Sequence, residues 1–325
     1  MAKKVIAVTD SPFPNLDSAR ATVAKIGGEI VQAKSGTPEA ILEVARNADA
    51  ILTTYAKVTT EVVSALTQCK IIARFGIGVD NVDIDMATKK GIVVTKVPDY
   101  CIDEVSDHAM ALLLSIVRKI PYSNKLVQGG RWEMPAVVPI ARLRGRTLGL
   151  VGFGRIPQLV APKAQAFGIN VVTYDPFVPK DVLAKANVKH VEFEELLKIS
   201  DYVSLHCPLM PETKHIMNAK TFAMMKPGSY IVNTGRGPLI DEAALAVALD
   251  KGQLAGAALD VVEKEPPTDS PIMGRDNVII TPHTAFYSEE ALLDLQTKAA
   301  EEVVRVLSGE APKNPVNPDA LKVAG

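Results

Sequence analysis

The stretch Thr147-Leu148-Gly149-Leu150-Val151-Gly152-Phe153-Gly154-Arg155-Ile156-Pro157 decides how this sequence folds. Its first half is typical of a short buried strand, and the strand leads directly into two closely spaced glycines. A helical pattern follows to Phe167, and a second strand pattern, 170–174, ends at Asp175. The order is therefore strand, glycine turn, helix, strand and acid.

That order is typical of a dinucleotide-binding fold. Gly152 permits the tight turn, Gly154 lets the backbone approach a pyrophosphate, and the helix N-terminus points at the phosphates. Asp175 lies 23 residues after Gly152, where a carboxylate accepts hydrogen bonds from the adenosine ribose hydroxyls. The same carboxylate repels a 2′-phosphate, and Pro176 and Phe177 follow it in place of an arginine. The stretch therefore predicts NAD rather than NADP as cofactor.

Two prolines depart from the usual pattern of this turn. Pro157 stands where a third glycine is usual, and Pro162 lies well inside the predicted helix. A proline is tolerated in the first turn, but in a helix interior it removes a backbone hydrogen bond. We therefore expect a bent or locally opened helix near residues 158–162.

The chain on either side of this stretch also alternates strand and helix patterns, which indicates parallel βαβ units. Thus the expected fold class is α/β, with two Rossmann- or flavodoxin-like domains built on parallel sheets. Residues 1–99 and the returning tail 285–325 form a discontinuous substrate-binding domain, and residues 100–284 form the NAD-binding domain. The expected strands are 5–9, 29–32, 50–54, 71–75, 92–95, 147–151, 170–174, 202–206, 230–233, 256–261 and 278–281. The main expected helices are 18–26, 39–47, 60–68, 103–119 and 288–307, with an irregular segment over 120–144.

Composition excludes several classes of protein. The chain has 36 Lys and Arg against 37 Asp and Glu, so nothing points to nucleic acid or an anionic membrane as a partner. It has neither a signal-peptide pattern nor an apolar run long enough to cross a bilayer. The three cysteines, Cys69, Cys101 and Cys207, are far apart and indicate thiols in a reducing cytoplasm. No histidine shows metal-ligand spacing, so we expect no metal.

Three charged residues follow strands of the second domain, at the sheet edge where ligands bind. They are Arg236 in Asn233-Thr234-Gly235-Arg236-Gly237, Glu265 before Pro266, and His283 after Pro282. Arginine binds a carboxylate through two parallel hydrogen bonds, histidine exchanges a proton near neutral pH, and a nearby glutamate favours and orients the imidazolium. Together they suit the reduction of a keto acid. Spacing alone leaves open an ordinary Arg236–Glu265 ion pair beside a structural histidine.

The sequence resembles the D-isomer-specific 2-hydroxyacid dehydrogenases over nearly its whole length. The motifs are LKISDYVSLHCPL at 197–209, MKPGSYIVNTGRG at 225–237, GAALDV at 256–261 with Glu265-Pro266, and Thr281-Pro282-His283. By this resemblance Arg236, Glu265 and His283 match the family's catalytic trio. The expected function is NAD-dependent hydride transfer between a small D-2-hydroxy acid and its 2-keto acid, with glyoxylate- or hydroxypyruvate-like substrates.

The resemblance also assigns binding residues. The stretch RFGIGVDN at 74–81 resembles the family's substrate loop, in which the amides of Ile77 and Gly78 meet the substrate carboxylate. Arg74 adds a charge there, unless it pairs with Asp80 or Asp83. The other expected cofactor-binding residues are Arg155, Ile156, His206, Cys207, Pro208, Thr213, Thr234, Gly235, Asp260 and Thr284.

The segment after His283 resembles that of the C-terminal-binding-protein branch, which often has Trp where this chain has Phe286. Phe286 and Tyr55 are therefore expected in the substrate pocket, with core packing an equal alternative for Tyr55. The branch suggests another function, an NAD(H)-sensing corepressor-like or scaffold protein, while the intact trio favours an enzyme. An NADP-linked reductase of aldehydes or other ketones is disfavoured by Asp175. By resemblance the protein is a homodimer that uses the 103–119 helix and residues 120–144.

Overall fold

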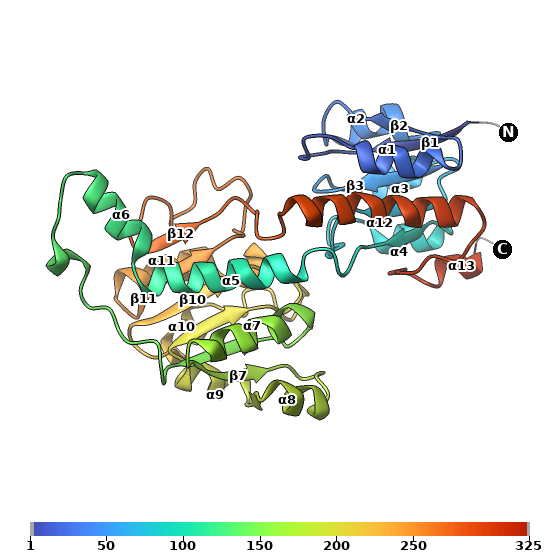
Figure 1. Ribbon diagram of the computed structural model, residues 1–325. Coiled ribbons are helices and arrows are strands. Elements are labelled where there is room, and N and C mark those ends of the chain that lie inside the picture. The colour runs from blue at the N-terminus through green and yellow to red at the C-terminus, as the bar shows by residue number, and fades with distance from the viewer. Residues whose placement is uncertain (1–2, 324–325) are drawn as a thin grey trace. The chain divides into compact units, whose positions relative to one another are not determined.

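The computed structural model describes residues 3–323, which divide into two compact units (Figure 1). Unit 1 contains the described residues up to Tyr100 and from Ser288 onward, and unit 2 is Cys101–Tyr287. The division therefore falls one to three residues from the expected positions 99/100 and 284/285. Each unit has its own parallel sheet, and this confirms the expected fold class.

The sheet of unit 1 has the strand order β2-β1-β3-β4-β5, with all pairs parallel. This is the order of a flavodoxin-like fold. The strands are β1 (Lys4–Val8), β2 (Gly28–Gln32), β3 (Ala50–Thr53), β4 (Ile71–Arg74) and β5 (Val93–Thr95). Strands β3, β4 and β5 are buried along their whole length, as expected where helices cover both faces of a parallel sheet.

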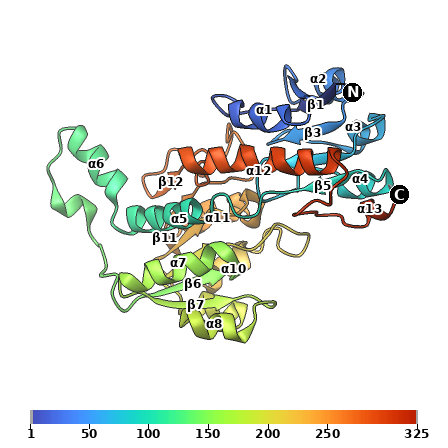
Figure 2. The ribbon, with the colours of Figure 1, turned by 45° about the vertical axis from the view of Figure 1, so that its right-hand side comes forward.

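Helices cover both faces of this sheet (Figures 1 and 2). One face packs against α2 (Pro38–Ala45), α3 (Thr60–Ala65) and α4 (Ile84–Lys89). The other side holds α1 (Asp17–Ala24) and α12 (Glu289–Leu307), which pack on each other and on the sheet. The tail then reaches the edge strand β5, where the side chain of Asn317 accepts a hydrogen bond of 2.7 Å from the Val94 amide. The last helix of this unit is α13 (Ala320–Val323).

The sheet of unit 2 has the order β12-β11-β10-β9-β6-β7-β8, again with parallel pairs. Because the chain goes from β6 to β7 on one side and returns to β9 on the other, the sheet has a topological switch between β6 and β9. Ligands of open α/β sheets bind beyond the carboxyl ends of the strands at such a point. The strands are β6 (Thr147–Val151), β7 (Asn170–Tyr174), β8 (Lys189–His190), β9 (Tyr202–Leu205), β10 (Ser229–Asn233), β11 (Leu254–Leu259) and β12 (Val278–Ile280).

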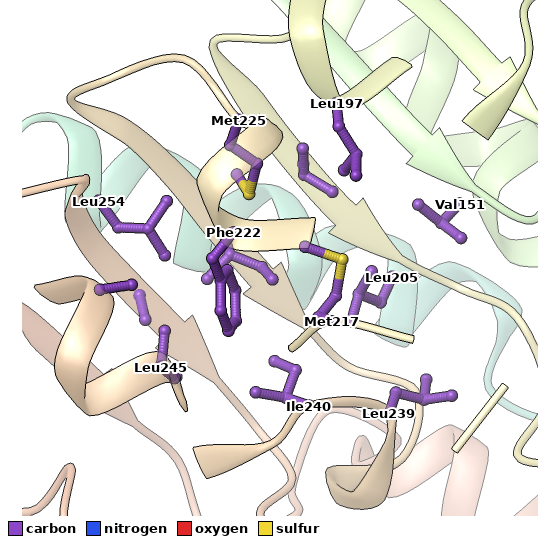
Figure 3. Packing of buried hydrophobic residues seen from close by; sticks show 14 of the residues in the cluster. Val151, Leu197, Leu205, Met217, Phe222, Met225, Leu239, Ile240, Leu245 and Leu254 are labelled. Atoms are coloured by element: carbon purple, nitrogen blue, oxygen red, sulfur yellow. The ribbon is translucent and has the colours of Figure 1, made fainter. Parts of the chain in front are cut away.

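Alternate residues of these strands enter two separate cores. On β9, Val203 and Leu205 face one core and Tyr202 faces the other. Figure 3 shows the first core, where Phe222 lies near Met225, Leu245 and Leu254 with no more than 2% of each side chain exposed. The helices over this face are α9 (Phe193–Ile199), α10 (Ala219–Met224) and α11 (Glu242–Asp250), and those over the other are α5 (Ile102–Val117), α7 (Arg155–Ala166) and α8 (Lys180–Ala186).

Some sequence expectations are wrong in detail. The segment 120–144 is not irregular throughout, because α6 (Ile120–Gln128) occupies its first part and the 3₁₀ turn η1 (Met134–Val137) follows. Lys119 precedes α6 with a φ of 53°, and a proline lies in its first turn, where proline is tolerated. The locally opened turn expected near residues 158–162 is also absent, since α7 is helical from Arg155 to Ala166, and the bend expected there stays a prediction. In residues 3–323, no helix combines the length and the apolarity needed to cross a membrane.

Candidate active site

The glycine turn after β6 has two glycines with different surroundings. Gly152 has a φ of +94°, and a β-carbon there would lie 2.9 Å from the Cys207 nitrogen and the His206 carbonyl carbon. The loops that follow β6 and β9 therefore touch at the switch point of the sheet. Gly154 has a φ of −71°, and apart from its neighbours along the chain no atom of residues 3–323 lies within 4 Å of its missing β-carbon. The turn thus leaves open space at the N-terminus of α7, where a pyrophosphate fits.

Asp175 follows β7 and reaches back to the same turn. Its Oδ2 accepts a hydrogen bond of 2.7 Å from the Phe153 amide, and its Oδ1 accepts one of 2.9 Å from the Phe177 amide. A carboxylate oxygen has two lone pairs, so each oxygen can still accept a hydroxyl. The arrangement holds the carboxylate beside the glycine turn, where the sequence predicts contact with the ribose.

The other predicted cofactor residues lie in α7 or in loops at this edge of the sheet. Arg155 and Ile156 begin α7, with Arg155 exposed. The His206 ring contacts the Ser204 hydroxyl at 2.8 Å, and burial lowers the pKa of His206 to about 4. Burial also raises the pKa of the Cys207 thiol to about 11. The Thr213 hydroxyl donates to the Pro208 carbonyl over 2.7 Å, so it holds its own loop in shape.

The loop after β10 carries the predicted arginine. The buried Asn233 side chain accepts from the Gly235 amide at 2.9 Å and donates to the Arg236 carbonyl at 2.8 Å. One Arg236 guanidinium nitrogen donates to the Gly235 carbonyl over 2.9 Å. The buried Thr234 hydroxyl has no hydrogen-bond partner in the described residues. An orphaned hydroxyl and the open space at Gly154 both fit a dinucleotide bound along this edge.

Glu265 and His283 lie in direct contact. The Nδ1 atom of His283 is 2.8 Å from Oε2 of Glu265, while Oε1 accepts a 3.3 Å hydrogen bond from the Val262 amide. Burial acts to raise the pKa of Glu265. The His283 hydrogen bond and charge, helped by the Arg236 charge, outweigh burial and hold that pKa below its usual range. The structure therefore brings the predicted trio together within unit 2.

Asp260 stabilises the backbone conformation of the loop that contains His283. His283 has a φ of 54°, a left-handed conformation that costs energy for a residue with a side chain. The buried Asp260 carboxylate holds the loop in this form by accepting from the Thr281 hydroxyl and from the amides of Thr284 and Ala285, over 2.5, 2.9 and 2.9 Å. The sequence predicts Asp260 as a cofactor residue, and its contact with a cofactor stays a prediction.

The predicted substrate residues of unit 1 lie at the end of β4 and after β3. Arg74 is buried, and its guanidinium occupies the space that a β-carbon on Gly76 would need, 1.3 Å away. Among the described residues, the amides of Ile77 and Gly78 donate no hydrogen bond within the chain. Tyr55 is 41% exposed, so the alternative of a core role for it is wrong. In unit 2, the Phe286 ring lies 6.4 Å from the His283 ring in an edge-on arrangement.

Sequence reasoning missed Glu242, a buried acid in the first turn of α11 that contacts the Glu265 loop. Acidic residues are common in the first turn of a helix, where they interact favourably with the helix dipole, so the sequence around Glu242 did not indicate a role in the site. Within residues 3–323, no group of three or more His, Cys, Asp and Glu is placed to bind a metal ion.

The fold and this site define unit 2 as a dinucleotide-binding domain of the dehydrogenase type. Residues 110–285 match the family model described as D-isomer specific 2-hydroxyacid dehydrogenase, NAD binding domain. The chain therefore belongs to the D-isomer specific 2-hydroxyacid dehydrogenase family. This match confirms both the family indicated by the motifs and the NAD-binding domain.

Individual relatives agree with this assignment. The chain is 42% identical to D-3-phosphoglycerate dehydrogenase of Methanocaldococcus jannaschii over 89% of its own length and 56% of that protein. It is 38% identical to glyoxylate reductase of Thermococcus litoralis over 86% of this chain and 87% of that one. The chain thus spans little more than half of the phosphoglycerate dehydrogenases it matches.

Among solved structures, the chain is similar to D-lactate dehydrogenase from Aquifex aeolicus, crystallised with NAD and lactic acid. The TM-score is 0.87 at 30% identity, and the match covers 97% of this chain and 99% of that one.

Proposed function

We propose that the protein is an NAD-dependent D-2-hydroxyacid dehydrogenase that interconverts a small D-2-hydroxy acid and its 2-keto acid. The observation that carries the proposal is the 2.8 Å contact between His283 Nδ1 and Glu265 Oε2, with the charge of Arg236 acting on the same carboxylate. These groups supply the proton donor, its orienting acid and the carboxylate anchor that the reaction needs.

The roles of the residues follow from this geometry. Bound NADH supplies the hydride for the carbonyl carbon of the keto acid. Because Glu265 holds Nδ1 of His283, the proton that His283 gives to the ketone oxygen comes from Nε2, and in oxidation Nε2 takes it back. Arg236 binds the substrate carboxylate through two parallel hydrogen bonds. The overall reaction converts a 2-keto acid, NADH and a proton into a 2-hydroxy acid and NAD⁺, and it is reversible.

Unit 1 contributes substrate recognition in this proposal. The amides of Ile77 and Gly78 bind the substrate carboxylate, Arg74 adds charge, and the exposed Tyr55 helps to select the side chain. Phe286 acts on specificity from beside His283. Glyoxylate, hydroxypyruvate and their close analogues are the favoured substrates, supported by the likeness to glyoxylate reductase of T. litoralis. The kinship to the C-terminal-binding-protein branch stays a prediction.

A steady-state assay tests the activity. NADH oxidation is followed with glyoxylate, hydroxypyruvate, pyruvate and 3-phosphohydroxypyruvate in parallel, and NADH binding is measured by fluorescence titration. We expect turnover with at least one of these 2-keto acids. Tight NADH binding without any turnover would instead favour an NAD(H)-sensing scaffold.

We also propose that the protein is a homodimer of the cytoplasm. Figure 1 shows α6 and the loop after it extending away from the rest of unit 2. This segment exposes Trp132 (89%), Met134 (71%) and Val138 (54%), and exposed apolar clusters mark interaction sites. The cytoplasmic location is supported by three cysteines that form no disulfide. Light scattering after gel filtration tests the dimer, and the mass of a single chain would contradict it.

A further inference from the structure

The segment that carries Glu265 is held on both sides by one carboxylate, that of Glu242. Oε1 of Glu242 accepts a hydrogen bond of 2.6 Å from the Glu263 amide, and Oε2 accepts one of 2.5 Å from the Ser270 hydroxyl. Glu265 lies between these two contacts in the sequence. A single side chain therefore fixes both ends of the loop that carries the acid.

Glu263 makes the reverse contact and extends it. Its Oε2 accepts a 3.2 Å hydrogen bond from the Glu242 amide, and its Oε1 lies 2.6 Å from Nε2 of His215. The His215 amide in turn donates to the Pro238 carbonyl at 2.8 Å. The Glu265 loop is thus connected to the first turn of α11, to the loop after β9 and to the turn after Arg236.

Helix α11 does not need Glu242 for its own start. The neighbouring Asp241 is the N-cap, and its side chain accepts from the Ala244 amide at 3.0 Å. Glu242 is only 6% exposed, and burial of a carboxylate costs free energy unless hydrogen bonds compensate for it. The two described hydrogen bonds of its carboxylate both go to the loop, and neither goes to the helix. The burial of Glu242 therefore serves the loop.

We propose that Glu242 is a positioning residue that sets the Glu265 carboxylate against the His283 imidazole. The inference rests on the proposed function, in which Glu265 orients His283. Without the Glu242 carboxylate, the Glu263 amide and the Ser270 hydroxyl lose their acceptor and the loop between them is no longer fixed at its ends. Glu265 then spends less time at hydrogen-bonding distance from Nδ1 of His283, and the chemical step slows.

The experiment compares Glu242→Ala with Asp241→Ala, a matched control that removes the neighbouring acid and the helix cap but no contact to the loop. We expect Glu242→Ala to lower kcat roughly tenfold or more, because small misplacements of a catalytic group have large effects. NADH affinity should stay at the wild-type value, since no contact of Glu242 involves the glycine turn or Asp175. Asp241→Ala should keep kcat near wild type despite a lower melting temperature.

Glu242→Gln supplies the rescue. Glutamine keeps an acceptor oxygen for the Glu263 amide, and its amide group can donate to the Ser270 hydroxyl, so kcat should recover most of the loss. If Glu242→Ala does not fold, Ser270→Ala removes one of the two contacts and should lower kcat at unchanged NADH affinity.

Two failures can be told apart. Wild-type protein that binds NADH but reduces no 2-keto acid overturns the proposed function. The positioning role alone is overturned if the wild-type protein is active and Glu242→Ala lowers kcat no more than Asp241→Ala does. If Glu242→Ala does not fold, the same comparison is made with Ser270→Ala.

Discussion

Gly237 packs so closely on Val262 that a β-carbon at Gly237 would lie 1.8 Å from the Val262 carbonyl oxygen. Gly237 directly follows Arg236, and the Val262 amide donates to the Glu265 carboxylate at 3.3 Å. The loop of the proposed carboxylate anchor and the loop of the proposed orienting acid therefore meet backbone to backbone. This contact limits how far Arg236 and Glu265 can separate.

Gly237→Ala tests this contact. The new methyl group must push the two loops apart, because the atoms it meets are backbone atoms that cannot rotate away. We expect kcat for keto-acid reduction to fall roughly tenfold or more, and the melting temperature to fall as well. Gly28→Ala in β2 is the control, since its β-carbon would lie 2.8 Å from the Val23 carbonyl oxygen; it should lower the melting temperature and leave kcat near wild type. Wild-type kcat in a folded Gly237→Ala variant would contradict the prediction.

His283→Ala removes the proposed acid and base. We expect kcat to fall roughly a hundredfold or more, the usual scale for loss of a general acid. NADH affinity should change little, because the glycine turn and Asp175 are untouched. Stopped-flow reduction of a 2-keto acid together with NADH fluorescence titration measures both quantities. Equal turnover in the variant would remove His283 from the chemistry.

The two glycines of the nucleotide turn should respond differently to alanine. Gly152→Ala places a β-carbon 2.9 Å from backbone atoms at a φ of +94°, so we expect a clear loss of folding free energy, on the order of 1–3 kcal/mol or more. Gly154→Ala meets only open space, and its stability should stay within about 1 kcal/mol of wild type. NADH affinity should nevertheless fall, because the methyl group enters the space proposed for the pyrophosphate. Urea unfolding and NADH titration separate the two effects, and undiminished NADH affinity in Gly154→Ala would place the phosphates elsewhere.

The sequence predicts this part of the fold well for a physical reason. Strands β6 and β7 have the expected bounds, Thr147–Val151 and Asn170–Tyr174, because a glycine turn and an acid punctuate a short buried run on each side. Helix α6, in contrast, lacks this punctuation: it starts after Lys119 in a left-handed conformation, and its first turn contains Pro121. Its local pattern is therefore close to that of a loop.

The candidate site also contains residues that the sequence reveals and residues whose role only the fold reveals. Arg236, Glu265 and His283 are marked in the sequence because each is a charged residue just beyond a strand. The sequence does not mark the supporting roles of other residues. It predicts Asp260 only as a cofactor residue and does not single out Glu242, and only the fold shows that Asp260 shapes the His283 loop and that Glu242 holds the Glu265 loop. Contacts between loops distant in the chain depend on tertiary packing, which periodicity does not report.

Asp175→Ala tests cofactor choice. The Asp175 carboxylate stands beside the glycine turn and carries the negative charge proposed to repel a 2′-phosphate. We expect the variant to bind NADH more weakly and to discriminate less against NADPH, as measured by kcat/KM for each cofactor. The variant also loses the acceptor of the Phe153 amide, so its melting temperature serves as a control for folding. An unchanged NADH to NADPH ratio would argue that the carboxylate points away from the ribose.

His206, a partly buried histidine in the loop that follows β9, predicts a pH dependence of stability. Burial lowers the pKa of His206 from 6.5 to about 4 in the folded chain. Between these pH values the unfolded chain binds a proton on His206 that the folded chain does not. The contribution of His206 to the free energy of unfolding is therefore fully present above pH 6.5 and is lost as the pH falls toward 4. At about 1.4 kcal/mol per pH unit, the whole interval corresponds to about 3 kcal/mol, with about 2 kcal/mol already lost at pH 5.

His206→Gln isolates this contribution, because glutamine can keep the hydrogen bond to Ser204 and does not titrate. Urea unfolding of both proteins at pH 7 and pH 5 gives the difference, since carboxylates such as Glu265 affect the two proteins alike. The wild type should lose about 2 kcal/mol more than the variant between these two pH values. Equal losses would mean that the folded chain accepts a proton on His206 as readily as the unfolded chain, which would contradict the lowered pKa of this ring.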